Sequence, residues 1–327
     1  MYKNILLSIL VVFIAACSKP KPKSETIPTW YTHIPSDYKF LYAVAKSTTI
    51  EQAKKNAIVK MRDNLSKEVN TRFSSKNHKL QPLKKEILNK IKKYNVEVAN
   101  RLSFNRVKIE KSKTFKGEEL VLISIPRISI FNKLKSISDV KFHRAQEVNK
   151  KALNKNAIKR FMALEIAVKE WETLASLAQY KELLISTYSA NEEFIFLNDL
   201  KEEYNELKNS INFYVLTDGN SRIFSKSIKK AIEAKGLSVK NRINTKNSFK
   251  LLVTSKTIKS QNYTFNKSRN LVKLTTFDND KNKISFRQHT FIGKSRKNYK
   301  EAKEQAAIHL DYKIKKLGIF DFIGFEK

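Results

Sequence analysis

Apolar side chains recur at every fourth position in several stretches of this chain and alternate with polar ones in others. The clearest stripe consists of Ala53, Ala57, Met61, Leu65 and Val69. This spacing predicts one helix, and the small residues in its first half would let the backbone lie close to a sheet. Thr48, with Glu51 three residues later, matches a capping box at the start of that helix.

The stretch around this helix predicts a β-α-α-β-β-α module over residues 30–137. A buried strand is expected at 40–45, and a second amphipathic helix at 83–98 has Leu83, Ile87, Ile91 and Val98 facing inward. Leu102 to Ile109 suggests the next strand. A turn at Lys116-Gly117-Glu118 then leads into a strand at 120–125, which Pro126 ends.

Residues 138–210 have helical spacing with few helix breakers. One long helical stretch is expected from Val140 to Ile185, interrupted at 154–156, and another helix from Glu192 to Lys208. Together they predict a helical hairpin or stalk. We expect Phe161 and Trp171 to be core anchors rather than ligand-stacking groups.

The C-terminal segment, residues 211–327, predicts a strand and a helix followed by an antiparallel sheet and a closing helix. The strand covers 211–216, and the helix at 223–235 ends at Gly236. Strands at 249–258, 271–277 and 284–292 alternate apolar with polar residues, as a half-solvated sheet does. The closing helix is expected at 297–317, and an apolar tail follows it. The predicted fold class is therefore α+β.

The C-terminal segment also contains an internal echo of the N-terminal one. Ile292-Gly293-Lys294-Ser295 precedes Ala302, Ala306 and Leu310 at four-residue spacing, much as residues 44–47 precede the first helical stripe. Similar packing of a helix on a sheet explains the echo, and duplication is the alternative.

The amino-acid composition excludes several classes of protein. The chain has 327 residues, 65 Lys plus Arg against 31 Asp plus Glu, and a formal net charge of +34. With 41% hydrophobic residues, including 20 Phe and 12 Tyr, a fully disordered chain is not expected. The single Cys excludes a disulfide framework and a Cys-based zinc site.

The first 29 residues predict export. Lys3 precedes an apolar run from Ile5 to Phe13, which is too short to span a bilayer and is typical of a signal peptide over residues 1–16. The run leads to Ile14-Ala15-Ala16-Cys17, which resembles the bacterial lipobox. The resemblance implies cleavage between Ala16 and Cys17, with a covalent lipid on Cys17. An ordinary secretory peptide with an incidental Cys is the alternative.

Residues 17–29 form a lipidated Cys followed by a Pro- and Lys-rich tether, which favours extended chain. Ser18, in place of the Asp that often signals inner-membrane retention, favours the outer membrane. The mature protein is thus expected to be held in the cell outer membrane by its lipid, facing the periplasm or the cell surface.

The N-terminal module also carries a family resemblance. Pro28-x-Trp30, the run Tyr42-Ala43-Val44-Ala45-Lys46-Ser47 and the helical stripe that follows resemble the small bacterial surface-lipoprotein family named after a twenty-kilodalton LPP antigen. The module is similar to the N-terminal domain of the flagellar-ring protein FlgT as well. The resemblance covers residues 30–137, concerns packing residues, and brings no catalytic residue with it.

Motifs for catalysis or metal binding are incomplete. Gly293-Lys294-Ser295 imitates the end of a phosphate loop but has Gln288 where the first Gly belongs. Asp278-x-Asp280-x-Asn282 imitates a calcium loop but is better read as a polar hairpin turn. The five His, which are His33, His78, His143, His289 and His309, include no i, i+4 pair. We therefore expect no enzyme, no catalytic residue, no metal, and no cofactor besides the lipid on Cys17.

The charge leaves two function classes open. One is an assembly lipoprotein that binds other envelope proteins, by analogy with FlgT. The other is a binder of an anionic envelope polymer, peptidoglycan or lipopolysaccharide, through its distributed Lys side chains. Compositional bias can also explain the Lys excess. No nucleic-acid partner is expected for an exported, anchored protein.

Overall fold

The computed structural model describes residues 26–75, 85–241 and 247–326, and its fold is α+β, as predicted. The described chain forms two compact units. Unit 1 contains residues 26–75, 92–134 and 180–188, and unit 2 contains 85–91, 135–179, 189–241 and 247–326. The boundaries expected at residues 30–137, 138–210 and 211–327 stay predictions.

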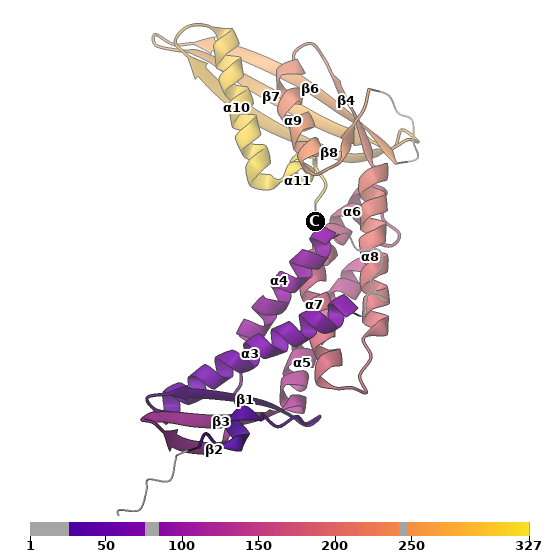
Figure 1. Cartoon of the computed structure of the whole chain (residues 1–327). Coiled ribbons are helices and arrows are strands. Elements are labelled where there is room, and N and C mark those ends of the chain that lie inside the picture. Colours follow the sequence, from indigo (N-terminus) through magenta and orange to yellow (C-terminus); the bar gives the residue numbers. More distant parts are fainter. Residues whose placement is uncertain (1–25, 76–84, 242–246, 327) are drawn as a thin grey trace, which may run out of the picture. The chain divides into compact units, whose positions relative to one another are not determined.

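Unit 1 is built around a three-stranded antiparallel sheet (Figure 1). Its elements are α2 (Thr29–Thr32), β1 (Phe40–Ser47), α3 (Ile50–Ser75), β2 (Lys108–Phe115) and β3 (Glu118–Pro126). The strand order is β1-β3-β2. The stripe predicted for α3 is buried in full and packs on β1 and β3. Among the described residues strand β2 pairs with β3 alone, and all its residues but the last are exposed.

Three local predictions in this unit need correction. Thr49, not Thr48, caps α3, because its hydroxyl accepts from the Gln52 N–H at 3.3 Å. The strand expected at 102–109 starts only at Lys108, since residues 102–107 lead out of α4 (Lys85–Arg101). The buried stripe of α4 is Ile91, Asn95 and Ala99, while Val98 is half-buried.

The Asn95 side chain explains the stripe of α4. Its amide donates to the Asn70 Oδ1 at 2.8 Å, and the Asn95 carbonyl accepts from the Tyr180 hydroxyl at 2.6 Å. Asn95, a polar residue, can therefore lie on the buried face of α4 between Ile91 and Ala99, because its polar groups are hydrogen-bonded there. The side chains of Leu83 and Ile87 lie outside the described part.

The helical middle of the chain contains α5 (Arg127–Ala152), α6 (Ala157–Val168), α7 (Trp171–Leu184) and α8 (Asn191–Ser210). The break predicted at 154–156 is present, but a second break at 169–170 was not predicted. The Trp171 indole N–H donates to the Leu197 carbonyl at 2.8 Å in a fully buried position. Phe161 is also fully buried and stacks on Tyr204 at 5.1 Å. Both aromatic residues are core anchors, as expected.

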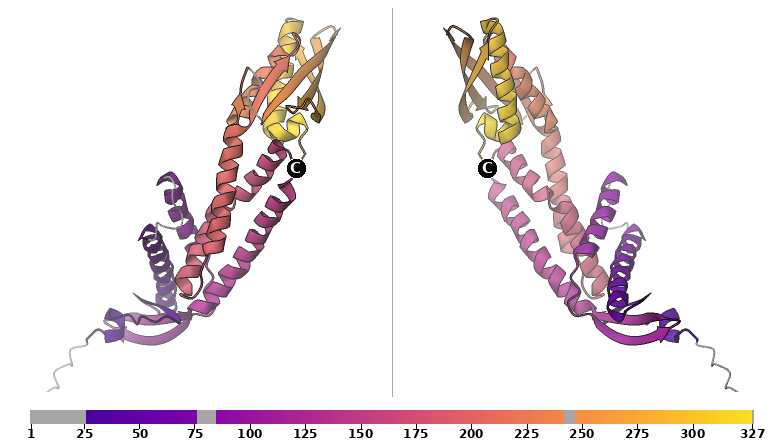
Figure 2. Two further views of the ribbon diagram at one scale, coloured as in Figure 1. Left: turned by 90° about the vertical axis from the view of Figure 1, so that its right-hand side faces the viewer. Right: turned by 90° about the vertical axis from the view of Figure 1, so that its left-hand side faces the viewer.

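The C-terminal part of unit 2 is a five-stranded sheet with helices on one face (Figures 1 and 2). Its elements are β4 (Asn212–Thr217), α9 (Arg222–Ala234), β5 (Ser238–Val239), β6 (Ser248–Gln261), β7 (Asn266–Phe277), β8 (Lys283–Ser295), α10 (Tyr299–Leu317) and α11 (Ile319–Ile323). The order is β5-β4-β6-β7-β8. Strands β6 to β8 are antiparallel as predicted, but β4 runs parallel to β5 and β6 because α9 is a crossover helix.

The core lies between the sheet and helices α9, α10 and α11. Alternate residues of the strands point into it, including Phe213, Leu251, Val272 and Phe291. The apolar tail at 319–325 is α11 and its continuation, and its apolar side chains are buried in this core. The covered face of the sheet is therefore apolar over most of its length.

Gly293 shows how closely α10 lies against β8. A Cβ at this position would meet the Ala302 carbonyl oxygen at 1.8 Å and the Ala306 nitrogen at 2.6 Å. Gly293 thus serves helix packing rather than a phosphate loop. The internal echo corresponds to a shared local arrangement. In each case a strand is followed by a helix that packs back on it, α3 on β1 and α10 on β8.

Candidate anion-binding surface

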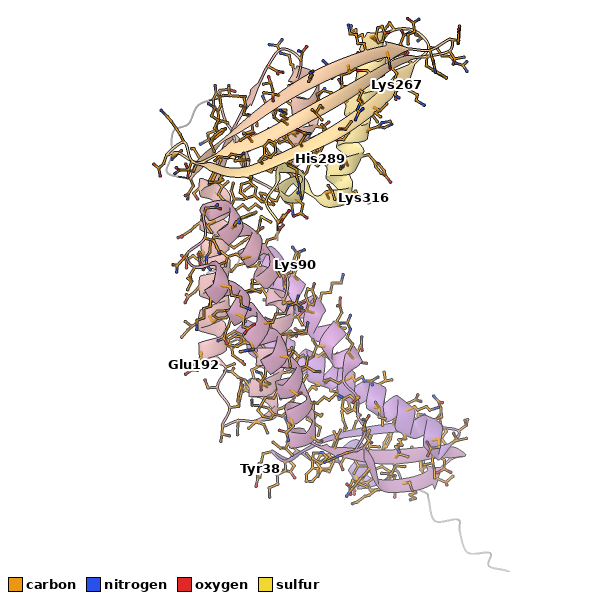
Figure 3. All side chains as sticks on the ribbon, turned by 180° about the vertical axis from the view of Figure 1, so that it is seen from behind. Tyr38, Lys90, Glu192, Lys267, His289 and Lys316 are labelled. Atoms are coloured by element: carbon orange, nitrogen blue, oxygen red, sulfur yellow. The ribbon has the colours of Figure 1, made fainter. Side chains whose placement is uncertain are left out.

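The face of the C-terminal sheet opposite α9 and α10 carries a set of basic side chains. Alternation along the strands places one set of residues in the core and the other on this face. Figure 3 views the sheet from this side, with α10 behind the strands. We call it the basic sheet face, and its cations are Lys250, Lys256, Lys267, Arg269, Lys273, Lys283 and Lys294.

The basic sheet face has no acidic residue to balance these cations. Strands β4, β6, β7 and β8 contain no Asp or Glu at all. Within the described residues, none of the seven cations forms an ion pair with a carboxylate. On the helices the situation differs, because Lys141 pairs with Glu170 at 2.5 Å and Lys235 with Glu165 at 2.7 Å. The strands therefore concentrate positive potential without the carboxylates that accompany the cations of the helices.

Two of the cations oppose each other directly. Lys267 of β7 is the register partner of Lys294 of β8, and Ser260 of β6 faces Lys267 from the other side. Side chains directly opposite in an antiparallel pair lie about 5 Å apart at Cβ, and like charges there destabilise the pair. Figure 3 labels Lys267 near this end of the sheet. An anion bound between the two ammonium groups would relieve the repulsion.

Apolar side chains alternate with the cations across the same face. Ile258, Phe286 and Ile292 are exposed, and their register neighbours include Arg269 beside both Ile258 and Ile292. Leu252, Leu271 and Phe277 are half-buried. The Lys283 ammonium lies 4.4 Å from the centre of the Phe286 ring, and that of Lys250 lies 5.9 Å from the Phe277 ring. The face thus combines charge with apolar contact area.

The hairpin at one end of this face extends it. Residues 262–265 connect β6 to β7, and Tyr263 there is fully exposed. The Asn262 side chain holds the turn, since its Oδ1 accepts from the Phe265 N–H at 2.8 Å. The Arg296 guanidinium lies 5.4 Å from the Phe265 ring. The hairpin thus adds an exposed aromatic ring, Tyr263, and a nearby cation, Arg296, to this end of the sheet.

The residues singled out for lipid attachment cannot be placed. Ala16 and Cys17 lie outside the described residues, as does His78. The other motifs resolve into structural roles. Asp278 to Asn282 is the β7–β8 turn, where the Asp278 Oδ1 accepts from the Asn282 N–H at 2.8 Å. This confirms the hairpin-turn interpretation.

The four described His are not brought together. His33 and His143 are exposed, and the Nδ1 of His309 lies 2.8 Å from the Ile292 carbonyl oxygen. His289 is buried on the covered face, where its Nε2–H donates to the Phe322 carbonyl at 2.9 Å and its ring stacks on Phe322. No group of His, Cys, Asp or Glu suited to a metal ion occurs in the part of the chain that the structure describes.

The sequence interpretation missed the basic sheet face because it treated the charge as spread evenly along the chain. The signal was present in the strands themselves. Strands β6, β7 and β8 together carry only Lys and Arg as charged residues, while every long helix contains both signs. Alternation then decides which of those cations share a face. In the described residues no helix combines the length and the apolar character that crossing a bilayer requires.

Comparisons with known proteins leave the family unassigned. No family model matches the chain, and no curated protein matches its sequence. Among solved structures, a minor lipoprotein from Acinetobacter baumannii is 14% identical, with a TM-score of 0.28, over 35% of this chain and 93% of its own. The secreted protein HP1454 from Helicobacter pylori is 13% identical, with a TM-score of 0.35, over 85% of this chain and 98% of its own. These scores are too low to support an argument, so the LPP-family resemblance and the lipobox stay predictions.

Proposed function

We propose that this chain is a lipid-anchored, non-enzymatic protein of the bacterial cell envelope whose C-terminal sheet binds an anionic envelope polymer. The observation that carries the proposal is the basic sheet face, which holds seven cations and no carboxylate on one side of strands β6, β7 and β8. The lipobox-like sequence ending at Cys17 is the basis for the location.

Lipopolysaccharide is the polymer that this surface fits best. Its phosphate groups suit Lys and Arg side chains at strand spacing, and its amphiphilic character suits the apolar residues between them. Peptidoglycan offers carboxylates but little apolar surface, so Ile258, Phe286 and Ile292 would have no counterpart there. Peptidoglycan binding is therefore an outcome of the test rather than a second proposal.

The test is co-sedimentation of the full chain, held in phosphatidylcholine nanodiscs, with purified lipopolysaccharide or with sacculi. We expect binding to lipopolysaccharide that weakens as salt is raised, because salt screens exposed charges. Reversing Lys267 and Lys294 to Glu should weaken binding by about tenfold or more. The matched control reverses Lys55 and Lys60, which are exposed on α3.

Three outcomes would contradict the proposal. They are equal loss of binding in both double variants, binding that is unaffected by moderate salt, and a preference for sacculi. Assembly with other envelope proteins is the other class that the sequence left open. It predicts discrete partners in an in-cell crosslinking experiment whose yield does not change in the Lys267→Glu, Lys294→Glu variant.

A further inference from the structure

A groove between α5 and α6 lies outside the basic sheet face and has its own chemistry. Its volume is about 380 Å³, within the range of small-molecule sites. The lining residues are Val148, Lys151, Ala152, Lys155, Lys159, Met162, Ala163, Ile166 and Glu326. All of them belong to unit 2.

The floor of the groove is apolar. Ala152 and Met162 are buried, and Val148, Ala163 and Ile166 are half-buried. The short Ala side chains open the space between the two helices, and Met can adapt to a flexible apolar ligand. Leu153, which follows Ala152 in the chain, is 60% exposed. This floor suits a hydrocarbon chain rather than a polar ligand.

The rim of the groove is positive. Lys151, Lys155 and Lys159 are exposed there, and Lys151 alone contacts a carboxylate, that of Glu147, at 3.4 Å. Within the described ranges no carboxylate lies at ion-pair distance from Lys155 or Lys159. The one acidic lining residue, Glu326, is already paired with Arg287 at 3.2 Å. Two ammonium groups thus remain for an anionic head group.

We propose that this groove binds a single-chain anionic amphiphile, with the hydrocarbon chain on the apolar floor and the carboxylate or phosphate head between Lys155 and Lys159. Charge complementarity and the apolar floor together select this class. The volume matches a small ligand, whereas a partner helix would need a longer groove. The proposal is independent of polymer binding on the sheet, because it uses other residues and other elements.

The experiment is photocrosslinking of the full chain in phosphatidylcholine nanodiscs with a diazirine derivative of palmitic acid, followed by peptide mapping. We expect crosslinks concentrated in residues 148–166. Dodecanoate and dodecyl phosphate should each compete, and their relative potency distinguishes a carboxylate from a phosphate head. Dodecyltrimethylammonium, which has the same chain and the opposite charge, should not compete.

Two variants test the two halves of the site. Ala163→Trp fills the floor and should reduce crosslinking at 148–166 by about tenfold. Lys155→Glu with Lys159→Glu leaves the floor intact and should reduce it by a similar factor. The matched control is Lys226→Glu with Lys230→Glu, since both residues are exposed four positions apart on α9. Circular dichroism verifies that each variant is folded.

Several results would overturn the proposal. One is label spread over the chain without enrichment at 148–166. Another is undiminished crosslinking in folded Ala163→Trp or in the double Lys variant. Equal competition by the cationic amphiphile would indicate adsorption without charge selection. Labelling of 148–166 by a diazirine phosphatidylcholine in the nanodisc, in place of the fatty acid, would assign the groove to the membrane surface.

Discussion

At the scale of single residues, Arg160 is a buried charge that is held by several hydrogen bonds. Arg160 is 5% exposed, and its guanidinium binds both carboxylate oxygens of Glu203, at 2.6 and 2.5 Å. A third hydrogen bond joins Arg160 to the Asn149 carbonyl at 2.5 Å. These hydrogen bonds connect α5, α6 and α8. Removing one partner of the ion pair destabilises the fold, because the other charge is then left buried and unpaired.

Glu203→Gln should destabilise unit 2 by about 3 kcal/mol, because it leaves the buried guanidinium without its counter-charge. The measurement is urea unfolding followed by circular dichroism. Glu202→Gln is the control, since Glu202 is the exposed neighbour on the same helix. A Glu203→Gln variant as stable as this control would show that Arg160 does not depend on the pair.

Gly293→Ala should also destabilise unit 2, by about 3 kcal/mol, because the new Cβ would overlap the backbone of α10 at Ala302. Gly219→Ala serves as the comparison, since a Cβ there meets nothing within 4 Å. Thermal unfolding of the two variants measures the difference. Similar midpoints would mean that α10 can move away from β8 at little cost.

At the scale of elements, periodicity predicted most helices and strands, and the misses have physical causes. The stripe of α3 and the alternation of β7 follow directly from the sequence because one face of each is buried. The break before Trp171 does not follow from local spacing; Trp171 begins α7 and donates its indole N–H to Leu197 of α8, a contact between helices that the spacing does not reveal. The parallel pairing of β4 likewise depends on the crossover through α9, which local spacing does not reveal.

The packing of α11 against β8 has a pH-dependent consequence at this scale. Burial lowers the pKa of His289 below its ordinary value, the hydrogen bond to Phe322 opposes this, and Lys313 and Arg287 lower it further. Between the lowered pKa and the unfolded value of about 6.5, the unfolded chain binds more protons than the folded one. Stability should therefore fall as the pH drops from about 7 towards 5.

Unfolding midpoints measured across this pH range check the expectation. In His289→Gln the decline should be smaller, because Gln can still donate to the Phe322 carbonyl but does not titrate. His143→Gln is the control, since His143 is exposed on α5. A wild-type midpoint that stays level from pH 7 to 5 would contradict a lowered pKa for His289.

At the scale of the whole molecule, the sequence predicted the fold class but not the surface that we propose for function. Net charge alone could not locate a site, because +34 is distributed over every segment. Only strand register assigns Lys267, Arg269 and Lys294 to a single face. The groove between α5 and α6 was equally hidden, since the pairing of two helices is a tertiary property.

The location that we propose for the whole protein rests on Cys17, and the proposal can be tested directly. Cys17→Ala should abolish incorporation of labelled palmitate and prevent stable anchoring through the lipid, since several acyl chains are needed for a lasting anchor. Metabolic labelling and fractionation of the envelope measure both effects. Ser18→Ala should retain the label. Palmitate that enters the Cys17→Ala protein would refute the lipobox assignment.

If many copies share one bilayer, the exposed edge of β2 becomes a site at which two copies could pair strand to strand. Anchoring confines neighbours to two dimensions in a common orientation, which raises the chance that their unpaired edges meet. Lys108, Lys111 and Lys113 are exposed on β2 and outnumber its one acidic residue, Glu110, and mutual repulsion of like charges opposes intermolecular strand pairing. The lysines of β2 would thus keep a crowded population of this protein monomeric.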